Sequence, residues 1–346
     1  MPDIELPAPL KLDPWACSSL LQKSIRRSED SLARRAGLTL YRQRGVAVFR
    51  RLAMIAVEDI GIADIGLVQE VSRIATDKAL RAVLSSDADL IDDLCTKMAA
   101  SIKDRSADYL YSAATNLGLE EQAKLKSGPV AEQMTIASSP EEPISRKAMA
   151  ALIACTSVRG TNAILRADRV EELLEKVGDM PDALRNAVLS LSRMRAHPFC
   201  ILLPLIWLGW SVERASSEVV ADQMPASEFY EGIPLYTFDK HTAAGKQAIA
   251  KLAHHCLPIR NLLSKQAHRD CWAEVIGVAA FYADAAPVAH RLAWPTGSRL
   301  AETGFMADMV AAGCRPDGAV AVLNCVISNL ADLNQFRRAT AFTSEK

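Results

Sequence analysis

The residues best suited to chemistry lie in the stretch YTFDKHTAAGKQAIAKLAHHC, which runs from residue 236 to residue 256. Thr242 is of a type that caps the start of a helix, where unpaired backbone amides attract anions. Lys240, His241 and Lys246 place positive charge around this start, and Gly245 leaves room for a ligand to approach. The sequence therefore predicts an anion-binding site, suited to a phosphate or a nucleic-acid backbone.

Two other interpretations of this stretch stay open. Asp239 and His241 have the residue types of an acid–base pair, so the segment from Asp239 to Thr242 could belong to an enzyme or a phosphate-binding protein. Alternatively, a capped helix with solvated lysines explains the same residues without any ligand. The enzyme interpretation requires these side chains to converge in a pocket together with another acid or a metal.

Zinc-type ligands also occur in this part of the chain. Neighbouring histidines on a helix point about 100° apart, so two of them rarely bind one ion. The spacing of the histidines and cysteines also matches no standard zinc pattern. We therefore expect no metal and no cofactor, and we interpret these side chains as core or surface residues: His254, His255, Cys256, His268 and Cys271.

A second concentration of charge lies nearer the N-terminus. Residues 23–51 contain nine Lys or Arg and two acids, whereas residues 58–93 contain nine acids and three bases. Basic side chains in such a cluster can contact phosphates without reading a base sequence. The expected nucleic-acid contacts are Lys23, Arg26, Arg27, Arg34 and Arg35. Pairing of this basic cluster with the acidic stretch is the alternative.

The segment RRLAMIAVEDIGIAD, residues 50–64, places two acids at the C-terminal end of a predicted helix. The helix dipole disfavours such a placement by about 0.3–1 kcal/mol per charge. We expect Glu58 and Asp59 to meet Arg26 or Arg27, or the amides of a helix capped by Asp64. A patch for another subunit is the alternative. The charged residues assigned to an interface or a structural role are Arg50, Arg51, Glu58, Asp59 and Asp64.

Composition and periodicity predict an all-α protein of many helices. Apolar residues make up 50% of the chain and aromatic residues 5%, and no strand alternation or repeat is evident. Ser28 and Thr242 are expected to cap helices, and Gly45 and Gly61 to end them. The expected organisation is an extended arm (1–16), a helical domain (17–125), a linker rich in Pro, Ser and Gly (126–144) and a second helical domain (145–346).

Cysteine use and hydropathy predict a cytoplasmic protein that does not contact membranes. The eight cysteines form no CxxC pair, which indicates reduced thiols. No signal peptide is expected. The most apolar run, FCILLPLIWLGW at residues 199–210, is too short to span a bilayer and is interpreted as a core element. A net charge of -1 argues against general binding of polyanions by the whole surface.

Two N-terminal segments, QKSIRRSEDSLARRAGLTL and FRRLAMIAVEDIGIAD, resemble a known family. They are similar to the C-terminal helical region of the replication-associated recombination protein A family. These proteins are AAA+ ATPases related to clamp loaders, and are known in eukaryotes as Werner-helicase-interacting proteins. The resemblance covers residues 17–66 and extends weakly to residue 116 through IKDRSADYLYSAA. Val57 and Ile65 depart from the usual pattern.

The resemblance implies a collar-like helical module that forms homo-oligomers and works with DNA, replication or repair proteins. It does not bring an ATPase, because the printed sequence lacks the Gly-rich loop before Lys-Ser/Thr that holds phosphates. At Gly245 and Lys246, Lys240 stands where the first glycine should be, and Gln247 replaces Ser or Thr. The expected function is a non-catalytic oligomerisation and docking module.

Overall fold

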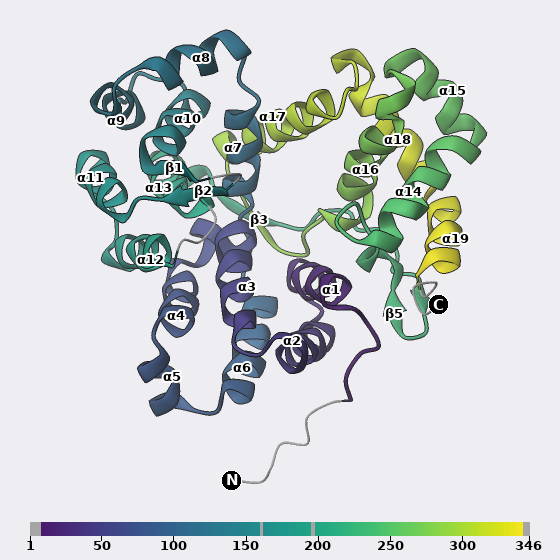
Figure 1. Ribbon diagram of the computed structural model, residues 1–346, viewed down its shortest axis with the longest axis horizontal. Helices are drawn as coiled ribbons and strands as arrows, with labels where there is room; N and C mark the ends of the chain where they lie inside the picture. Colours follow the sequence, from purple (N-terminus) through teal and green to yellow (C-terminus); the bar gives the residue numbers. More distant parts are fainter. Residues whose placement is uncertain (1–7, 160–161, 195–197, 342–346) are drawn as a thin grey trace. The chain divides into compact units, whose positions relative to one another are not determined.

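Helices dominate this protein, which confirms the predicted all-α class (Figure 1). The computed structural model describes residues 8–159, 162–194 and 198–341. Within these ranges the strands are two to four residues long and form three separate two-stranded antiparallel sheets: β1–β2, β3–β6 and β4–β5. The chain divides into two compact units, each described by itself below.

Unit 1 is assembled from three stretches of chain, 1–45, 221–289 and 306–346. Its elements are α1 (Pro14–Arg26), α2 (Asp30–Arg44), β4 (Phe229–Tyr230), β5 (Ile233–Pro234), η5 (Leu235–Thr237), α14 (Ala243–His255), α15 (Leu257–Gln266), η6 (Arg269–Cys271), α16 (Trp272–Ala280), η7 (Phe281–Ala285), the end of α17 (Pro295–Ala311), η8 (Pro316–Gly318), α18 (Ala319–Ser328) and α19 (Leu330–Thr340).

Local chemistry explains how the first helices of unit 1 form. Asp13 caps α1, because its Oδ1 accepts hydrogen bonds from the amides of Trp15 and Ala16 at 2.8 and 3.1 Å, and Pro14 fits the first helical position. Residues 8–13 lie along α2, where the Leu10 amide donates to Thr39 Oγ1 at 3.0 Å. Helix α1 packs along α2, and α14 packs against α16 and α19. Residues 1–7 of the predicted arm lie outside the described ranges.

Unit 2 consists of residues 46–220 and 290–305. Its elements are α3 (Ala47–Ile55), η1 (Ala56–Ile60), η2 (Gly61–Asp64), α4 (Ile65–Thr76), α5 (Lys78–Leu84), α6 (Asp87–Ala100), α7 (Ser106–Thr115), α8 (Leu119–Ser127), α9 (Val130–Ser138), α10 (Ile144–Cys155), β1 (Thr156–Arg159), β2 (Asn162–Leu165), α11 (Ala167–Val177), α12 (Asp182–Arg193), η3 (Pro198–Ile201), α13 (Leu203–Glu213), η4 (Arg214–Ser216), β3 (Glu218–Val220), β6 (Arg291–Ala293) and the start of α17.

The apolar run near residue 200 forms η3 and α13 in unit 2. One helical stretch in the described ranges, Pro198–Ser216, is long and apolar enough to cross a membrane by length and composition, and 44% of its most apolar window is buried. Residues 203–206 are buried, and α13 contacts α10, α11 and α12. The first half of this run is therefore a core element of unit 2, as predicted.

Several predicted boundaries are confirmed and others are wrong. Gly45 and Gly61 end their helices with φ of 57° and 54°, as expected. Ser28 does not cap α2, because it has a φ of 57° and the N-cap position falls on Glu29. The predicted linker at 126–144 is also wrong, since these residues contribute to α8, α9 and α10 within unit 2.

Candidate functional site

The helix start at Thr242 forms as predicted, but the space beside it is filled. Thr242 is the N-cap of α14, and its Oγ1 accepts a hydrogen bond from the Gly245 amide at 3.1 Å. A Cβ built on Gly245 would lie 2.0 Å from the carbonyl oxygen of Asp239. The backbone of Asp239 therefore occupies the room that the sequence assigned to a ligand, and this part of the anion-site prediction is wrong.

Asp239 belongs to a buried ion pair. Its Oδ2 lies 2.8 Å from Lys23 Nζ, and the two side chains are 2% and 3% exposed. Burial disfavours the charge on Asp239, but Lys23 and His241 outweigh this effect and lower the pKa of the carboxyl. Burial lowers the pKa of Lys23 to about 8, although Asp239 opposes the shift. The pair ties α1 to the start of α14, so Asp239 is engaged in holding the fold.

His241 does not form a side-chain pair with Asp239. The Asp239 Oδ1 instead accepts the backbone amide of His241 at 2.9 Å. The imidazole ring lies edge-on to Phe281 with ring centroids 6.0 Å apart. Partial desolvation of the ring by neighbouring groups, together with the charges of Lys240 and Lys23, lowers the pKa of His241 to about 4 against the opposing effect of Asp239. The ring is therefore neutral at pH 7 and adds no positive charge to an anion site, whereas Lys246 remains exposed.

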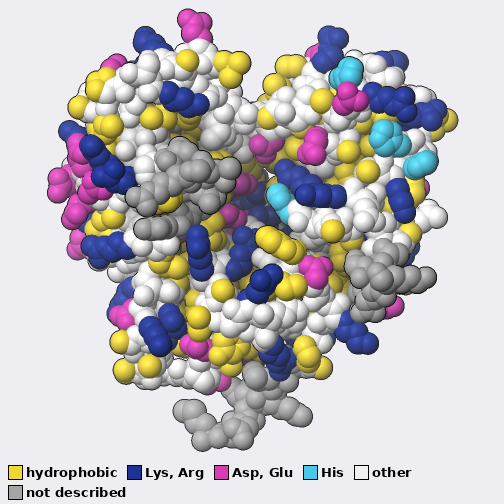
Figure 2. All heavy atoms as spheres, in the orientation of Figure 1, with side chains coloured by type: hydrophobic (Ala, Val, Ile, Leu, Met, Phe, Trp, Pro, Cys, Tyr) yellow, Lys and Arg dark blue, Asp and Glu magenta, His cyan; other side chains and the backbone are white. Residues whose placement is uncertain are grey.

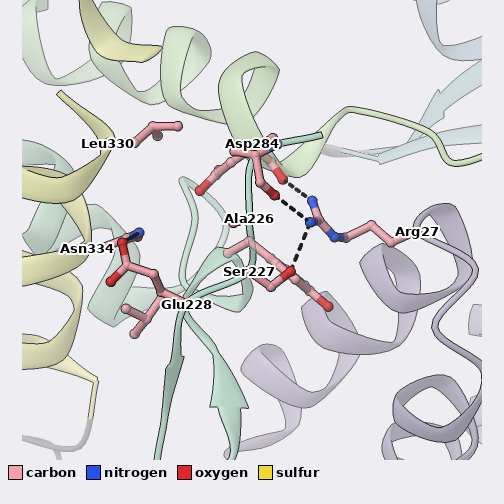
Figure 3. A pocket seen from close by; sticks show the side chains of 10 residues that line it. Arg27, Ala226, Ser227, Glu228, Asp284, Leu330 and Asn334 are labelled. Carbon is pink, nitrogen blue, oxygen red and sulfur yellow. Dashed lines mark hydrogen bonds between the residues drawn. The ribbon is translucent and has the colours of Figure 1, made fainter. Parts of the chain in front are cut away.

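A small polar pocket of about 210 Å³ lies beside Arg27 in unit 1 (Figure 3). Arg27 follows the end of α1, and its guanidinium points toward Asp284 and Ser227. It donates to the carbonyl oxygens of Asp284 and Pro225 at 3.2 and 3.1 Å, and to Ser227 Oγ at 2.9 Å. Its Nε lies 3.3 Å from Glu29 Oε1. The Arg27 guanidinium therefore forms its hydrogen bonds and its ion pair with other residues of unit 1.

A second buried ion pair, Asp284 with Arg337, borders this pocket. The Arg337 side chain is fully buried, and its Nη1 and Nη2 both reach the Asp284 carboxylate. Arg337 also donates to the Phe238 carbonyl at 2.9 Å and to Asn334 Oδ1 at 3.0 Å. This guanidinium links η7, α19 and the loop before α14, which sequence reasoning missed because the partners lie far apart in the chain.

Unit 2 contains a comparable arrangement around Asp59. Helix α3 ends in the π-helical turn η1, where Asp59 is fully buried and its Oδ1 lies 3.2 Å from Arg105 Nε. The Asp59 carbonyl accepts the amide of Asp104 at 3.0 Å. Asp64 caps α4 as predicted, because its Oδ1 accepts the Leu67 amide at 2.9 Å. Asp59 therefore meets a buried cation, and Asp64 caps a helix start.

One sequence signal for Arg105 exists. The pattern Arg-Ser-x-Asp-x-Leu occurs twice, at residues 27–32 and 105–110, and we call it the Arg-Ser motif. Each copy leads into a helix, α2 or α7, and each arginine contacts a π-helical turn, η7 or η1. Arg27 binds the backbone carbonyl of Asp284, whereas Arg105 binds the carboxylate of Asp59. In each unit the motif arginine thus links a π-helical turn to the start of the helix that follows the motif, η7 to α2 in unit 1 and η1 to α7 in unit 2.

Two further buried charges lie just before the second Arg-Ser motif. Lys103 Nζ donates to the carbonyls of Ala99 and Ser101 at 3.0 and 2.5 Å at the end of α6, and burial lowers its pKa to about 8. Burial raises the pKa of Asp104 to about 6, although hydrogen bonds from Ser106 oppose the shift. The Ser106 hydroxyl donates to Asp104 Oδ1 at 2.6 Å. Sequence reasoning did not identify either residue.

The predicted phosphate contacts are mostly inside the protein. Lys23, Arg26 and Arg27 are 2%, 4% and 8% exposed, and Arg26 Nη1 donates to the Ala285 carbonyl at 3.1 Å. These three side chains are therefore not on the surface, where contact with nucleic acid would require them to be. Arg34 and Arg35 are half-buried on α2, and their contact with nucleic acid stays a prediction. Among the residues predicted to have an interface or structural role, Arg50 is exposed, whereas Arg51 and Glu58 are half-buried.

The histidines and cysteines are placed separately. Among the described residues, no three His, Cys, Asp or Glu side chains are arranged to hold a metal ion. The rings of His254 and Trp272 are 5.6 Å apart, and those of His255 and Phe336 are 6.4 Å apart. The eight cysteines are free thiols, six of them buried. Burial raises the pKa of Cys17, Cys155 and Cys200 to about 12, which leaves these thiols weakly reactive.

No family model matches this chain, and no curated protein or solved structure matches it either.

Proposed function

We propose that this protein is a non-catalytic helical docking module that assembles with copies of itself and serves replication or repair proteins. The resemblance of residues 17–66 to a collar-like assembly region supports this proposal. The observation that carries it is that the charged motif residues are occupied in holding the fold. Asp59, Asp239 and Asp284 each contact a cation that is at most 3% exposed. Such pairs position helices and leave the exposed surface to do the binding.

The competing enzyme interpretation is less well supported by the same contacts. Catalysis by an acid–base pair needs titratable side chains that face a substrate within hydrogen-bonding distance. Asp239 instead faces Lys23, and His241 contacts Asp239 through its backbone amide. The pocket beside Arg27 has a volume of about 210 Å³, smaller than the roughly 300–1,000 Å³ common for ligand sites.

An exposed apolar surface in unit 2 suits a role in assembly. Val83 and Leu84, at the end of α5, are 83% and 52% exposed. They adjoin a shallow groove of about 190 Å³, formed by α4 and α5 and lined in part by Ile74, Leu80 and Leu84. Burying such side chains against a second copy removes apolar area from water, which stabilises the assembly by about 25 cal/mol per Å². We assign this α5 surface to self-association.

Sedimentation velocity at about ten to fifty micromolar protein tests the proposal. The wild type should form a dimer or tetramer, because the α5 surface is buried in contact with a second copy. Val83→Lys with Leu84→Lys should shift the protein toward monomer, since lysine at a buried apolar contact carries an unpaired charge. Leu119→Lys with Val212→Lys is the matched control, because these side chains are 86% and 87% exposed. A monomeric wild type would refute self-association.

A further inference from the structure

The helices α14 and α15 present a surface rich in positive charge and free of acids. From residue 240 to residue 269 the chain carries six Lys or Arg and four His, with no Asp or Glu. Figure 2 shows Lys, Arg and His side chains gathered over the region that Figure 1 labels α14 and α15. Five exposed cations define what we call the basic face: Lys246, Lys251, Arg260, Lys265 and Arg269.

The cations of the basic face are not used by the fold. None of the five has an ion pair with a described residue, in contrast to the buried pairs of Lys23 and Arg337. The acids that border the face come from neighbouring elements. Asp270 lies 3.3 Å from His268, while Glu274 and Asp332 are exposed on α16 and α19. Five unpaired cations in one region create a local positive field in a protein of net charge -1.

The side chains between these cations indicate which polyanion fits. Gln247, Asn261 and Ser264 are exposed and polar, so they can hydrogen-bond to phosphate or sugar oxygens. A helix that lies on a membrane needs several large apolar side chains on its exposed side. Between residues 240 and 269, all of them described, Leu257 is the one large apolar side chain that is exposed. This composition favours nucleic acid over a lipid surface.

No Phe, Tyr or Trp ring is exposed on the described part of the basic face, which favours a duplex over a single strand. Single strands bind through aromatic side chains on which bases stack. In the described region of the basic face, Trp272 is 8% exposed and its ring is covered in part by His254. A duplex, by contrast, offers regularly spaced phosphates, which flexible Lys and Arg side chains neutralise without base contacts.

We propose that the basic face binds the phosphate backbone of double-stranded nucleic acid without sequence preference. Lys246 and Lys251 on α14, and Arg260 and Lys265 on α15, are the principal contacts, and Arg269 adds to them. This surface takes the place of the buried Lys23–Arg27 cluster. The inference goes beyond the docking function and does not depend on it, because the basic face lies in unit 1 and the assembly surface in unit 2.

Fluorescence anisotropy with a labelled duplex of about 30 base pairs tests the proposal. Each neutralised phosphate contributes about -0.9 to the slope of log affinity against log salt. With four to five contacts, the affinity of the wild type should fall on the order of 100-fold between about 50 and about 200 mM salt. Replacing Lys246, Lys251, Arg260 and Lys265 by Gln should flatten the slope by about 3 to 4.

The matched control removes the same charge elsewhere. Lys78, Lys124, Lys126 and Lys176 are exposed lysines of unit 2, and their replacement by Gln should leave the slope unchanged. Lys246→Gln with Lys265→Gln is a milder variant that should flatten the slope by about 2. The proposal is overturned if folded wild type fails to bind at the lowest salt, or if the control flattens the slope equally. Tighter binding to phosphatidylserine vesicles than to the duplex would also overturn it, in favour of a lipid surface.

Discussion

The buried pair of Asp284 and Arg337 offers the sharpest test of how unit 1 is held together. Arg337 is fully buried, and three of its nitrogens bind Asp284, Phe238 and Asn334. Asp284→Ala leaves the guanidinium buried without its counter-charge. Breaking a buried pair in this way costs about 3–5 kcal/mol of the free energy of unfolding. For a unit of about 150 residues this corresponds to a fall in Tm of roughly 6–20 °C.

Urea unfolding followed by circular dichroism measures this loss. Asp317→Ala is the matched control in the same unit, because its partner Arg315 lies 3.2 Å away but both side chains are about two-thirds exposed. Exposed pairs contribute about 0–1 kcal/mol. Replacing both Asp284 and Arg337 by apolar residues should recover much of the loss. If Asp284→Ala costs no more than Asp317→Ala, the guanidinium is solvated and the pair does not hold η7 to α19.

Two further predictions concern buried groups. The pKa of Asp104 is raised to about 6 in the folded state. As the pH rises from about 4 to above 6, the carboxyl ionises more readily in the unfolded chain than in the folded protein, so the free energy of unfolding falls. This loss amounts to about 3 kcal/mol, and Asp104→Asn should remove it from the pH dependence of the urea midpoint. Gly245→Ala should destabilise α14 strongly, because the added Cβ would lie 2.0 Å from the Asp239 carbonyl. Gly118→Ala, where nothing lies within 4 Å, should be neutral in the same urea unfolding assay.

Helix ends were predictable where a single residue determines them. Gly45 and Gly61 adopt positive φ, which glycine tolerates best, and Thr242 caps α14 through its own hydroxyl. Prolines misled the domain assignment. Pro129 and Pro143 occupy the N-cap positions of α9 and α10, so they mark helix starts inside unit 2 and not a linker.

The partners of the charged residues could not be predicted from local sequence. Lys23 meets Asp239 and Arg27 meets Asp284 across more than 200 residues, and periodicity carries no information on such pairings. The density of basic residues in 23–51 therefore suggested an exposed cluster, whereas tertiary packing buries three of them. In residues 240–269, by contrast, the chain carries no acid, and five of its six Lys or Arg side chains are exposed.

The division of unit 1 into three stretches of chain affects the order in which the protein folds during synthesis. Lys23 emerges 216 residues before its partner Asp239, and Asp284 emerges before Arg337. At roughly 5–20 residues per second, α1 and α2 wait about 10–40 s for the segment that covers them. Most of unit 2, residues 46–220, leaves the ribosome within that interval. The nascent chain therefore completes most of its second unit while Lys23, Arg26 and Arg27 still lack the partners that cover them in the folded protein.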